Sequence, residues 1–332
     1  MRALIFDHLV IYFPMLNVLI VLGGLLLLVY GANRLVDGAS SLARNFRVSD
    51  MVIGLTIVAL GTSTPELFVN LMAAVGQNTQ IVLGNVLGSN ISNIFLILGI
   101  SALIYPLSVR SNTTWVEIPL CFLASLVILA MGSDAWLDHI SRSIITRSEG
   151  IVLLAFFAIF IGYSLHLLRT EALPEETIAR KLSPRRSVLF IVLGLVLLIA
   201  GGRFIVNGAV DLAESLGVPE RIIALTIVSL GTSLPELATS VVAVRKKNVD
   251  MAIGNVVGSN IFNIFFVLGI SSVIYPVEIP EGGMLDFATN ILAGLLLFVF
   301  IFVGKGRKLV GWEGMLFLMV YALYMILLFT RF

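Results

Sequence analysis

Two matching stretches, LTIVALGTSTPEL at residues 55–67 and LTIVSLGTSLPEL at residues 225–237, decide the fold of this chain. The match extends without a gap from residues 31–106 onto residues 201–276 at a constant offset, with about half of the positions identical. Chance similarity between two apolar segments would preserve Leu, Ile and Val, but it would not keep Pro, Glu, Asn and Ser in register. The chain therefore contains an internal repeat whose best-matched part is polar.

Composition places both copies of the repeat in a membrane. Hydrophobic residues make up 58% of the 332 residues and charged residues only 12%, whereas a soluble domain carries about 25% charged residues. The net charge of +1 gives no basic surface for a nucleic-acid backbone. A single cysteine, Cys121, excludes an intramolecular disulfide and a cysteine-built metal cluster. An ordinary soluble enzyme, a disordered protein and a nucleic-acid binder are all excluded.

The apolar residues form ten continuous runs, each long enough for a helix that crosses the ~30 Å core of a bilayer. They lack the alternation of barrel strands, so we predict an all-α membrane protein with ten transmembrane helices. The runs cover residues 15–43, 50–75, 80–106, 115–133, 150–168, 187–214, 221–244, 251–276, 284–304 and 312–330.

The runs divide into two sets of five, and this odd number decides how the repeats are oriented. The predicted units are a first five-helix repeat at 1–168 with its motif at 55–106, a cytoplasmic linker at 169–186, and a second repeat at 187–332 with its motif at 225–276. Because each repeat has five spans, the second enters the membrane from the opposite side, an inverted topology typical of secondary transporters. The alternative is a duplicated helical scaffold with no transport role.

The positive loop residues indicate the orientation of the whole chain. Lys and Arg gather in the loops that are cytoplasmic when the N-terminus lies outside. We therefore expect a multi-pass protein of the cell membrane with both termini outside.

Glu66 and Glu236 occupy equivalent positions in the two copies, well inside the spans. A carboxylate near the bilayer centre costs at least a few kcal/mol unless a cation binds it or a proton neutralises it. Two carboxylates that meet near the axis between the repeats carry a combined charge of −2, which matches one divalent cation or holds two or three monovalent ones. A buried protonated acid is the alternative interpretation of each glutamate.

The residues around the two glutamates offer oxygen ligands. Pro65 and Pro235 lack a backbone N–H, so we expect each helix to break there and free backbone carbonyls. Hydroxyl and amide side chains recur near the break and on the next run: Thr62, Ser63, Ser89, Asn93, Thr232, Ser233, Ser259 and Asn263. Since this set contains no sulfur or imidazole, it predicts a site for Ca²⁺, Na⁺ or Mg²⁺, and a dry cage favours Ca²⁺ over Mg²⁺.

Other polar residues in and beside the spans are interpreted as structural. Asp37 and Arg34 have the spacing of a local ion pair on one helix, and the basic run 245–247 is most simply a cytoplasmic anchor. Four asparagines are expected to bridge helices or cap the break: Asn85, Asn90, Asn255 and Asn260.

GTSTPEL and GTSLPEL, each followed by a GSNIxNI segment, resemble the two alpha-repeats of the calcium/cation antiporter superfamily, and most of all its prokaryotic sodium/calcium exchangers. The resemblance covers essentially the whole chain. It implies ten helices in two inverted halves and exchange of intracellular Ca²⁺ for extracellular Na⁺ by alternating access. In this family the first and sixth helices are thought to slide across the other eight. No enzymatic activity, cofactor or obligate protein partner is implied; the partners are the two ions and the bilayer.

The resemblance also implies roles for individual residues. Glu66 and Glu236 would bind both ions in turn, with Asn93 and Asn263 near them. Thr62 and Thr232 would add backbone carbonyls to the Ca²⁺ site. The Na⁺ sites would be completed by Ser63, Ser89, Ser233 and Ser259, and by the carbonyls of Ala59 and Ser229. Archaeal exchangers often have Asp where this chain has Asn263, whereas animal potassium-independent exchangers have Asn, so no potassium requirement is expected.

The charge of the pair predicts the stoichiometry. Two carboxylates neutralise one Ca²⁺ but leave three Na⁺ with one extra positive charge, so we expect electrogenic exchange of three Na⁺ for one Ca²⁺. A Ca²⁺/H⁺ exchanger that uses the same carboxylates is the nearest alternative. A cation channel is disfavoured because the repeat lies within one chain, and an intramembrane hydrolase because no His or Lys accompanies Ser63 or Ser233 in its motif.

Overall fold

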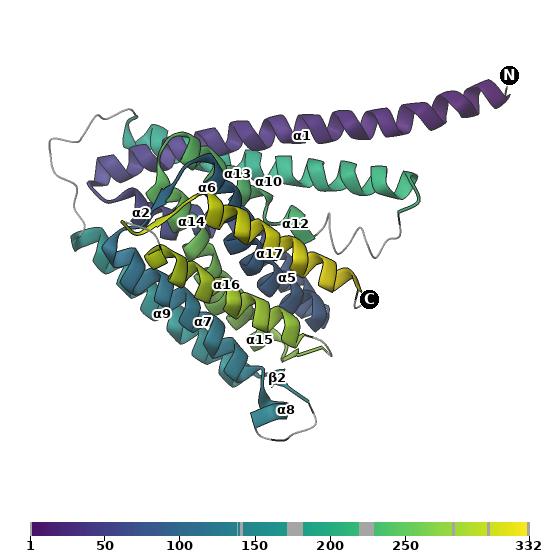
Figure 1. The fold of residues 1–332 in the computed structure, drawn as a ribbon. Coiled ribbons are helices and arrows are strands. Elements are labelled where there is room, and N and C mark those ends of the chain that lie inside the picture. The colour runs from purple at the N-terminus through teal and green to yellow at the C-terminus, as the bar shows by residue number, and fades with distance from the viewer. Residues whose placement is uncertain are drawn as a thin grey trace.

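The computed structural model describes residues 2–137, 139, 142–170, 182–218, 229–280, 283–303 and 306–330. These residues are almost entirely helical, which confirms the predicted all-α membrane fold (Figure 1). Within these ranges, eight helices are long and apolar enough to cross a bilayer, and a ninth candidate is the pair Asp50–Thr62 and Thr64–Val75, bent by 46° at its break. The seventh predicted span begins in residues 219–228, and most of the predicted linker 169–186 falls on 171–181; both segments lie outside the described residues.

The helices and strands of the two halves follow one another in chain order, and η marks a π-helix. The first half contains α1 (Arg2–Phe46), α2 (Asp50–Ile53), η1 (Gly54–Val58), α3 (Ala59–Thr62), α4 (Thr64–Val75), α5 (Thr79–Ile91), η2 (Ser92–Leu98), α6 (Gly99–Ile104), β1 (Leu107–Ser108), η3 (Thr113–Glu117), α7 (Ile118–Met131), α8 (Asp134–Leu137), β2 (Ile144–Ile145) and α9 (Arg147–Thr170). The second half contains α10 (Pro184–Ser215), α12 (Ser229–Gly231), α13 (Leu234–Arg245), α14 (Val249–Phe262), η6 (Asn263–Leu268), α15 (Gly269–Ile274), β3 (Val277–Glu278), α16 (Met284–Val303), β4 (Lys308–Leu309) and α17 (Gly311–Thr330). Two short antiparallel ribbons, β1 with β4 and β2 with β3, join the halves.

The long helices α1 and α10 lie side by side along one edge of the bundle (Figure 1). Glycines recur every seventh residue on their facing sides: Gly24, Gly31 and Gly38 on α1, and Gly194, Gly201 and Gly208 on α10. Gly24 meets Gly201 and Gly31 meets Gly194, so the helices are antiparallel. A Cβ on Gly31 would lie 2.9 Å from the carbonyl oxygen of Gly194, so only glycine allows the two backbones to pack this closely.

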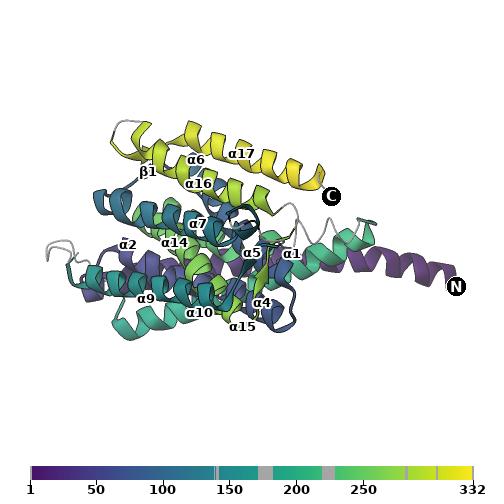
Figure 2. The same ribbon diagram turned by 90° about the horizontal axis from the view of Figure 1, so that it is seen from below.

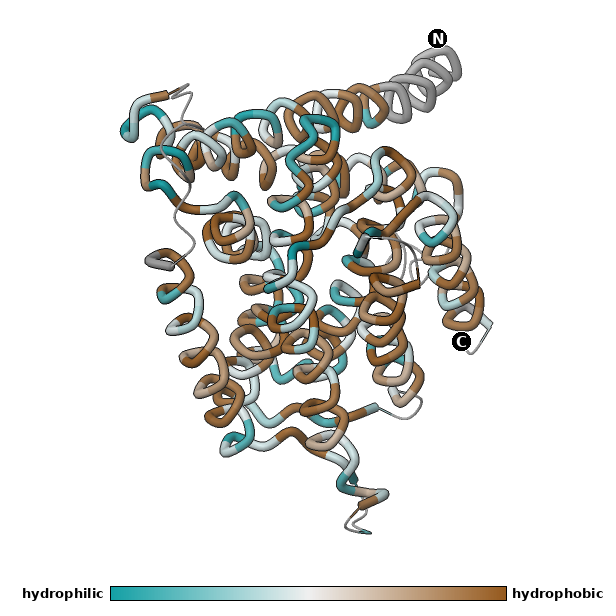
Figure 3. Tube along the Cα trace, turned by 60° about the vertical axis from the view of Figure 1, so that its left-hand side comes forward, coloured by the Kyte–Doolittle hydropathy of each residue, from teal (hydrophilic) through white to brown (hydrophobic). Residues whose placement is uncertain are grey.

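The remaining helices surround a buried centre formed by α5 with η2 and by α14 with η6. Figure 2 shows α16 and α17 on one side of the molecule and α9 and α10 on the opposite side, with α14 between them. Every residue of α14 except Asp250 is buried, and this helix contacts α2, η1, α3 and α13. The outer helices are mostly hydrophobic, whereas hydrophilic segments lie inside the bundle and at its ends (Figure 3). A polar interior with an apolar exterior suits a protein that faces lipid.

The sequence repeat also appears as a repeat of backbone features. Ser63 (φ −82°, ψ 11°) and Ser233 (φ −85°, ψ 2°) separate two helical segments in the same way. Gln77 and Lys247 both adopt the left-handed conformation, with φ of 60° and 61°, and each precedes an asparagine that caps the next helix. The π-helices η2 and η6 also occur at equivalent positions. The two copies therefore fold alike around the polar motif.

The predicted ion pair between Asp37 and Arg34 is wrong. Asp37 pairs instead with Lys246, at 2.9 Å between Nζ and Oδ1, and the Arg34 guanidinium lies over the rings of Tyr30 and Phe190 at 4.6 and 4.9 Å. Because Lys246 follows α13, this ion pair connects the end of α13 to α1.

Candidate ion-binding site

Each glutamate stands in the first turn of a helix that begins directly after a break. Glu66 belongs to α4 and Glu236 to α13, and each follows the proline of its TPE or LPE segment. Both side chains are 1% exposed. The first N–H groups of a helix have no intrahelical acceptor, so this end of the helix favours a negative charge. The breaks predicted from the two prolines are present in both copies.

The hydroxyl and amide residues of the next helix in each copy are also buried. Ser89 lies in α5 and Ser259 in α14, and four residues later Asn93 and Asn263 lie in the π-helices η2 and η6. The exposure of these four side chains is 2% or less. π-Helical turns inside α-helices often mark functional sites, because the extra residue shifts the side chains that follow it.

Hydrogen bonds join the two copies at the glutamates. The Ser63 hydroxyl donates to Oε1 of Glu236 at 2.8 Å, and its oxygen lies 2.9 Å from that of Ser259. A hydroxyl has a single proton, so Ser259 donates to Ser63 when Ser63 donates to the carboxylate. From the second copy to the first, the hydroxyl oxygen of Ser233 lies 3.4 Å from that of Ser89. The carboxylates of Glu66 and Glu236 are close enough to interact electrostatically. The buried region around these two carboxylates is named the pocket.

The two threonines beside the break bind asparagines of the opposite copy. The Thr62 hydroxyl donates to Oδ1 of Asn255 at 3.1 Å, and the Thr232 hydroxyl donates to Oδ1 of Asn85 at 3.3 Å. Asn255 in turn donates to the backbone carbonyl of Glu236, and Asn85 donates to that of Glu66, both at 3.4 Å. These bonds confirm that Asn85 and Asn255 bridge helices.

Several buried acceptor oxygens of the predicted site residues receive no hydrogen bond from the described residues. They are both Oε atoms of Glu66, Oε2 of Glu236, and Oδ1 of Asn93 and of Asn263. Buried polar atoms almost always have a partner in native proteins. Since all five atoms are acceptors, the partner that they lack is a donor or a cation. Carboxylate and amide oxygens are the ligands that hard cations prefer.

Two predicted carbonyl ligands differ from the rest of the set. The carbonyl of Ala59 accepts from the Ser63 N–H at 3.0 Å, so a protein donor occupies it. The Thr62 hydroxyl lies 3.3 Å from the same carbonyl and can donate its one proton either to it or to Asn255. Ser229 begins α12 at the equivalent position, and the structure describes its backbone but not its side chain. The structure therefore joins Glu236 with Ser63 and Ser259. It bonds Asn93 and Asn263 to asparagines of the opposite copy, and it gives the Ala59 carbonyl a protein donor.

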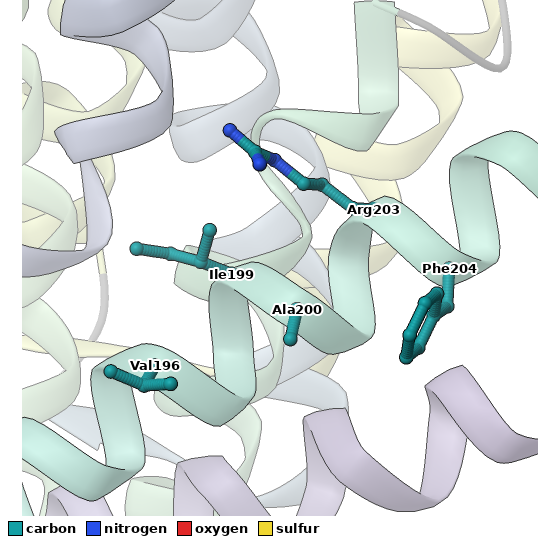
Figure 4. A pocket seen from close by; sticks show the side chains of 5 residues that line it. All are labelled: Val196, Ile199, Ala200, Arg203 and Phe204. Carbon is teal, nitrogen blue, oxygen red and sulfur yellow. The ribbon is translucent and has the colours of Figure 1, made fainter.

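A hollow of about 350 Å³ lies elsewhere, along α10 (Figure 4). Its lining residues are Val196, Ile199, Ala200, Arg203 and Phe204. All five project from one helix, four of them are apolar or aromatic, and none belongs to the pocket between the glutamates. This hollow is therefore separate from the candidate ion-binding site.

Two buried or half-buried acids outside the site were not singled out from the sequence. Glu117, 1% exposed, accepts from the Tyr163 hydroxyl at 2.5 Å, and Asp286 accepts from the Tyr324 hydroxyl at 2.9 Å. Each acid lies near the start of a span and its tyrosine lies on the last span of the same half. Neither acid reaches the site, so both interactions are assigned to packing of the outer helices.

An all-helical membrane bundle with an internal polar repeat, and with acids of both copies at one buried oxygen-lined pocket, has the organisation of a secondary cation transporter. The chain belongs to the sodium/calcium exchanger family: residues 16–166 and 186–330 match the family described as sodium/calcium exchanger protein. It is thus an antiporter of that family.

Known proteins and solved structures that resemble this chain over nearly their full lengths support this assignment. A putative antiporter, CaxA of Alkalimonas amylolytica, is 39% identical over 319 residues, which cover 93% of this chain and 98% of CaxA. The sodium/calcium exchanger MaX1 of Methanosarcina acetivorans is 31% identical, with 94% and 98% covered. The structure of the sodium-calcium exchanger NCX_Mj, soaked with 10 mM Na⁺ and no Ca²⁺, superposes with a TM-score of 0.81 at 32% identity and covers 93% of this chain and 98% of its own.

Proposed function

We propose that this antiporter exports Ca²⁺ from the cell in exchange for Na⁺ that enters. The pocket between Glu66 and Glu236 binds the two ions in turn. The observation that carries the proposal is that Ser63 of one copy donates to Glu236 of the other, while three of the four carboxylate oxygens of Glu66 and Glu236 are buried without a donor among the described residues. The ions named for MaX1 and NCX_Mj support the choice of Na⁺ and Ca²⁺.

The charge of the pocket supports a stoichiometry of three Na⁺ for one Ca²⁺. Among the described residues, no third acid, histidine or cysteine joins Glu66 and Glu236 in a cluster able to hold a metal ion. The pocket then carries at most two negative charges. One Ca²⁺ neutralises it, whereas three Na⁺ leave one positive charge, so each cycle moves one net charge across the membrane.

The side chains divide between the two cargo ions. Glu66 and Glu236 bind both, with Asn93 and Asn263 beside them, and the backbone carbonyls of Thr62 and Thr232 bind Ca²⁺. The threonine hydroxyls are directed to Asn255 and Asn85, which is compatible with a role for their carbonyls. The Na⁺ sites take Ser63, Ser89, Ser233 and Ser259, and the carbonyls of Ala59 and Ser229 join when the donors on Ala59 are released.

The proposal also includes ten transmembrane helices in two inverted five-helix repeats, 1–168 and 187–332. A cytoplasmic linker at 169–186 joins the two repeats. Both termini then lie outside the cell. The antiparallel packing of α1 on α10, the first helices of the two repeats, supports the inversion. The glycine-lined contact between α1 and α10 lets the pair move as one body, which supports alternating access by sliding of these two helices across the bundle.

The experiment is uptake of labelled Ca²⁺ by proteoliposomes that contain the purified protein. Vesicles loaded with Na⁺ should accumulate Ca²⁺ when diluted into a Na⁺-free medium, and an inside-positive potential should alter the rate of this uptake because each cycle moves net charge. Because positive charge leaves with the Na⁺, that potential should speed uptake and an inside-negative potential should slow it. Vesicles loaded with K⁺ instead should not accumulate Ca²⁺.

Acid-loaded vesicles test the alternative. Uptake driven by a proton gradient in the absence of Na⁺ would identify a Ca²⁺/H⁺ exchanger that uses the same carboxylates. If Na⁺-loaded vesicles take up Ca²⁺ at a rate that does not change with the membrane potential, the three-to-one stoichiometry would be rejected, but Na⁺/Ca²⁺ exchange would not.

A further inference from the structure

Asn90 and Asn260 form a reciprocal pair at the contact between the two repeats. The side-chain amide of Asn90 donates to the backbone carbonyl of Asn260, and that of Asn260 donates to the backbone carbonyl of Asn90, both at 3.2 Å. The two residues are equivalent in the repeat, and each is no more than 1% exposed. From the sequence they are interpreted as helix bridges, and this pair of bonds agrees with that role.

Each member of the pair also holds an asparagine of the opposite repeat. Asn93 donates from Nδ2 to Oδ1 of Asn260 at 2.9 Å, and Asn263 donates from Nδ2 to Oδ1 of Asn90 at 3.1 Å. Four amides from α5, η2, α14 and η6 thus form one closed arrangement in which every side-chain NH₂ group has an acceptor. The Oδ1 atoms of Asn93 and Asn263 are buried and receive no donor from the described residues.

The chemistry of these bonds fixes which end of each amide is which. A backbone carbonyl only accepts, so the atom of Asn260 that faces the carbonyl of Asn90 must be its NH₂ group. The Oδ1 atom of Asn260 then faces Asn93, and only a hydrogen-bond donor of Asn93 can bond to this oxygen. The NH₂ of Asn93 is therefore turned toward Asn260, and its Oδ1 occupies the other corner of the amide. The same reasoning applies to Asn90 and Asn263, and it removes the usual ambiguity of amide orientation.

We propose that Asn90 and Asn260 are positioning residues for cation binding. Each holds the ligand amide of the opposite repeat, Asn263 or Asn93, with its oxygen free for the ion and its NH₂ turned away. This inference rests on the proposed function and deepens it. An amide that rotated by half a turn would present two N–H groups to a cation and repel it, so the orientation decides whether these residues attract or repel the ion.

The test is a set of binding titrations on the intact purified protein with Ca²⁺ as the probe. Asn90→Leu removes the acceptor for Asn263 at similar volume, and we expect it to weaken Ca²⁺ binding by about tenfold or more. The apparent KM for Ca²⁺ in Na⁺-driven uptake should rise equally, with little change in the maximum rate. Asn290→Leu is the control, because Asn290 is a buried membrane asparagine that donates to Ser125 at 3.0 Å instead of to the site.

Double variants separate positioning from general packing. If Asn90 acts through Asn263, then Asn90→Leu should cause almost no further loss of Ca²⁺ affinity in a protein that already carries Asn263→Ala. In a protein that carries Asn93→Ala, the same change should cause its full loss of affinity. If Asn90→Leu does not fold, Asn90→Ala removes the same groups with less bulk. An unchanged Ca²⁺ affinity, or an equal loss in both backgrounds, would overturn the inference. Wild-type protein that binds Ca²⁺ but shows no Na⁺-driven uptake would reject the exchange function, and the titrations would still decide the role of Asn90.

Discussion

Ser63 of the first repeat donates a hydrogen bond of 2.8 Å to the carboxylate of Glu236 in the second. No equivalent bond from Ser233 to Glu66 occurs in the described part of the chain, where Ser233 lies instead 3.4 Å from Ser89. The pocket is therefore built by both repeats, but unequally. Glu236 has one oxygen held by the protein and one without a donor, whereas Glu66 has two oxygens without a donor.

The first prediction concerns these carboxylates. Glu66→Gln and Glu236→Gln should each reduce Ca²⁺ uptake to background, because one oxygen ligand becomes an NH₂ donor and the pocket keeps only one negative charge for a divalent ion. Labelled Ca²⁺ uptake into Na⁺-loaded proteoliposomes measures the effect.

Glu149→Gln is the matched control for both variants. Glu149 accepts from the N–H and the hydroxyl of Thr146 at the start of α9 and forms no cluster with Glu66 and Glu236, so its replacement should leave uptake near the wild-type rate. Wild-type uptake by either pocket variant would remove the site assignment.

The second prediction tests the contact between α1 and α10 with two neighbouring glycines. A Cβ on Gly24 would lie 2.8 Å from the carbonyl oxygen of Gly201, whereas a Cβ on Gly23 would meet nothing within 4 Å. Gly24→Ala should destabilise the protein by about 1–3 kcal/mol because backbone cannot move aside easily. Gly23→Ala should be neutral or slightly stabilising, since alanine favours helix by up to about 1 kcal/mol.

Thermal unfolding of the two variants in detergent compares them directly. Equal melting temperatures for Gly23→Ala and Gly24→Ala would contradict the close packing of α1 on α10.

The sequence predicts the spans and the polar repeat well because both depend on local properties. Eight of the predicted runs match the eight long helical spans of the described residues, seven of them to within three residues, whereas α1 begins 13 residues before its predicted run. An apolar run of this length spans a bilayer wherever it packs. Pro65 and Pro235 break their helices by a local effect of the missing N–H, so the breaks were also predictable.

Partners distant in the sequence were not predictable in the same way. The spacing of Arg34 and Asp37 favours a pair on one helix, but Lys246, 209 residues away, reaches Asp37 once α13 packs near α1. The roles of Asn90 and Asn260 depend on which amide end faces which carbonyl, and no sequence pattern records that. Their equivalent positions in the GSN segment of each repeat were the only available signal.

The third prediction concerns the tyrosines that bind acids outside the pocket. Tyr324→Phe removes the hydroxyl that donates to Asp286, and Tyr163→Phe removes the one that donates to Glu117. Each variant should lose about 1–3 kcal/mol of stability, the contribution of a hydrogen bond to a carboxylate. Their apparent KM for Ca²⁺ should stay at the wild-type value, because neither acid reaches the pocket. A KM raised severalfold without loss of stability would instead place one of these acids in the transport pathway.

The last prediction concerns the contacts between α1 and the α13–α14 turn. The Lys246–Asp37 ion pair is reinforced by Asn248, which donates to Ser40 on α1 at 2.9 Å. At the equivalent positions of the other repeat the chain has Gly76 and Asn207, so that end has no matching ion pair. If α1 slides during the cycle, these contacts must break each time. Both side chains are partly exposed, so the ion pair contributes at most about 1 kcal/mol and Lys246→Met should change the uptake rate only a few-fold.

A covalent link at the same place should have a much larger effect than loss of the ion pair. Asp37→Cys with Lys246→Cys, in a Cys121→Ala background, can be joined by a short bis-maleimide, which adds one cysteine thiol at each end, and joining should stop Ca²⁺ uptake because α1 can no longer leave α13. Each single-cysteine variant treated with the same reagent controls for modification alone. Normal uptake by fully cross-linked protein would mean that α1 and α13 stay together throughout transport, and the sliding of α1 with α10 would have to be abandoned.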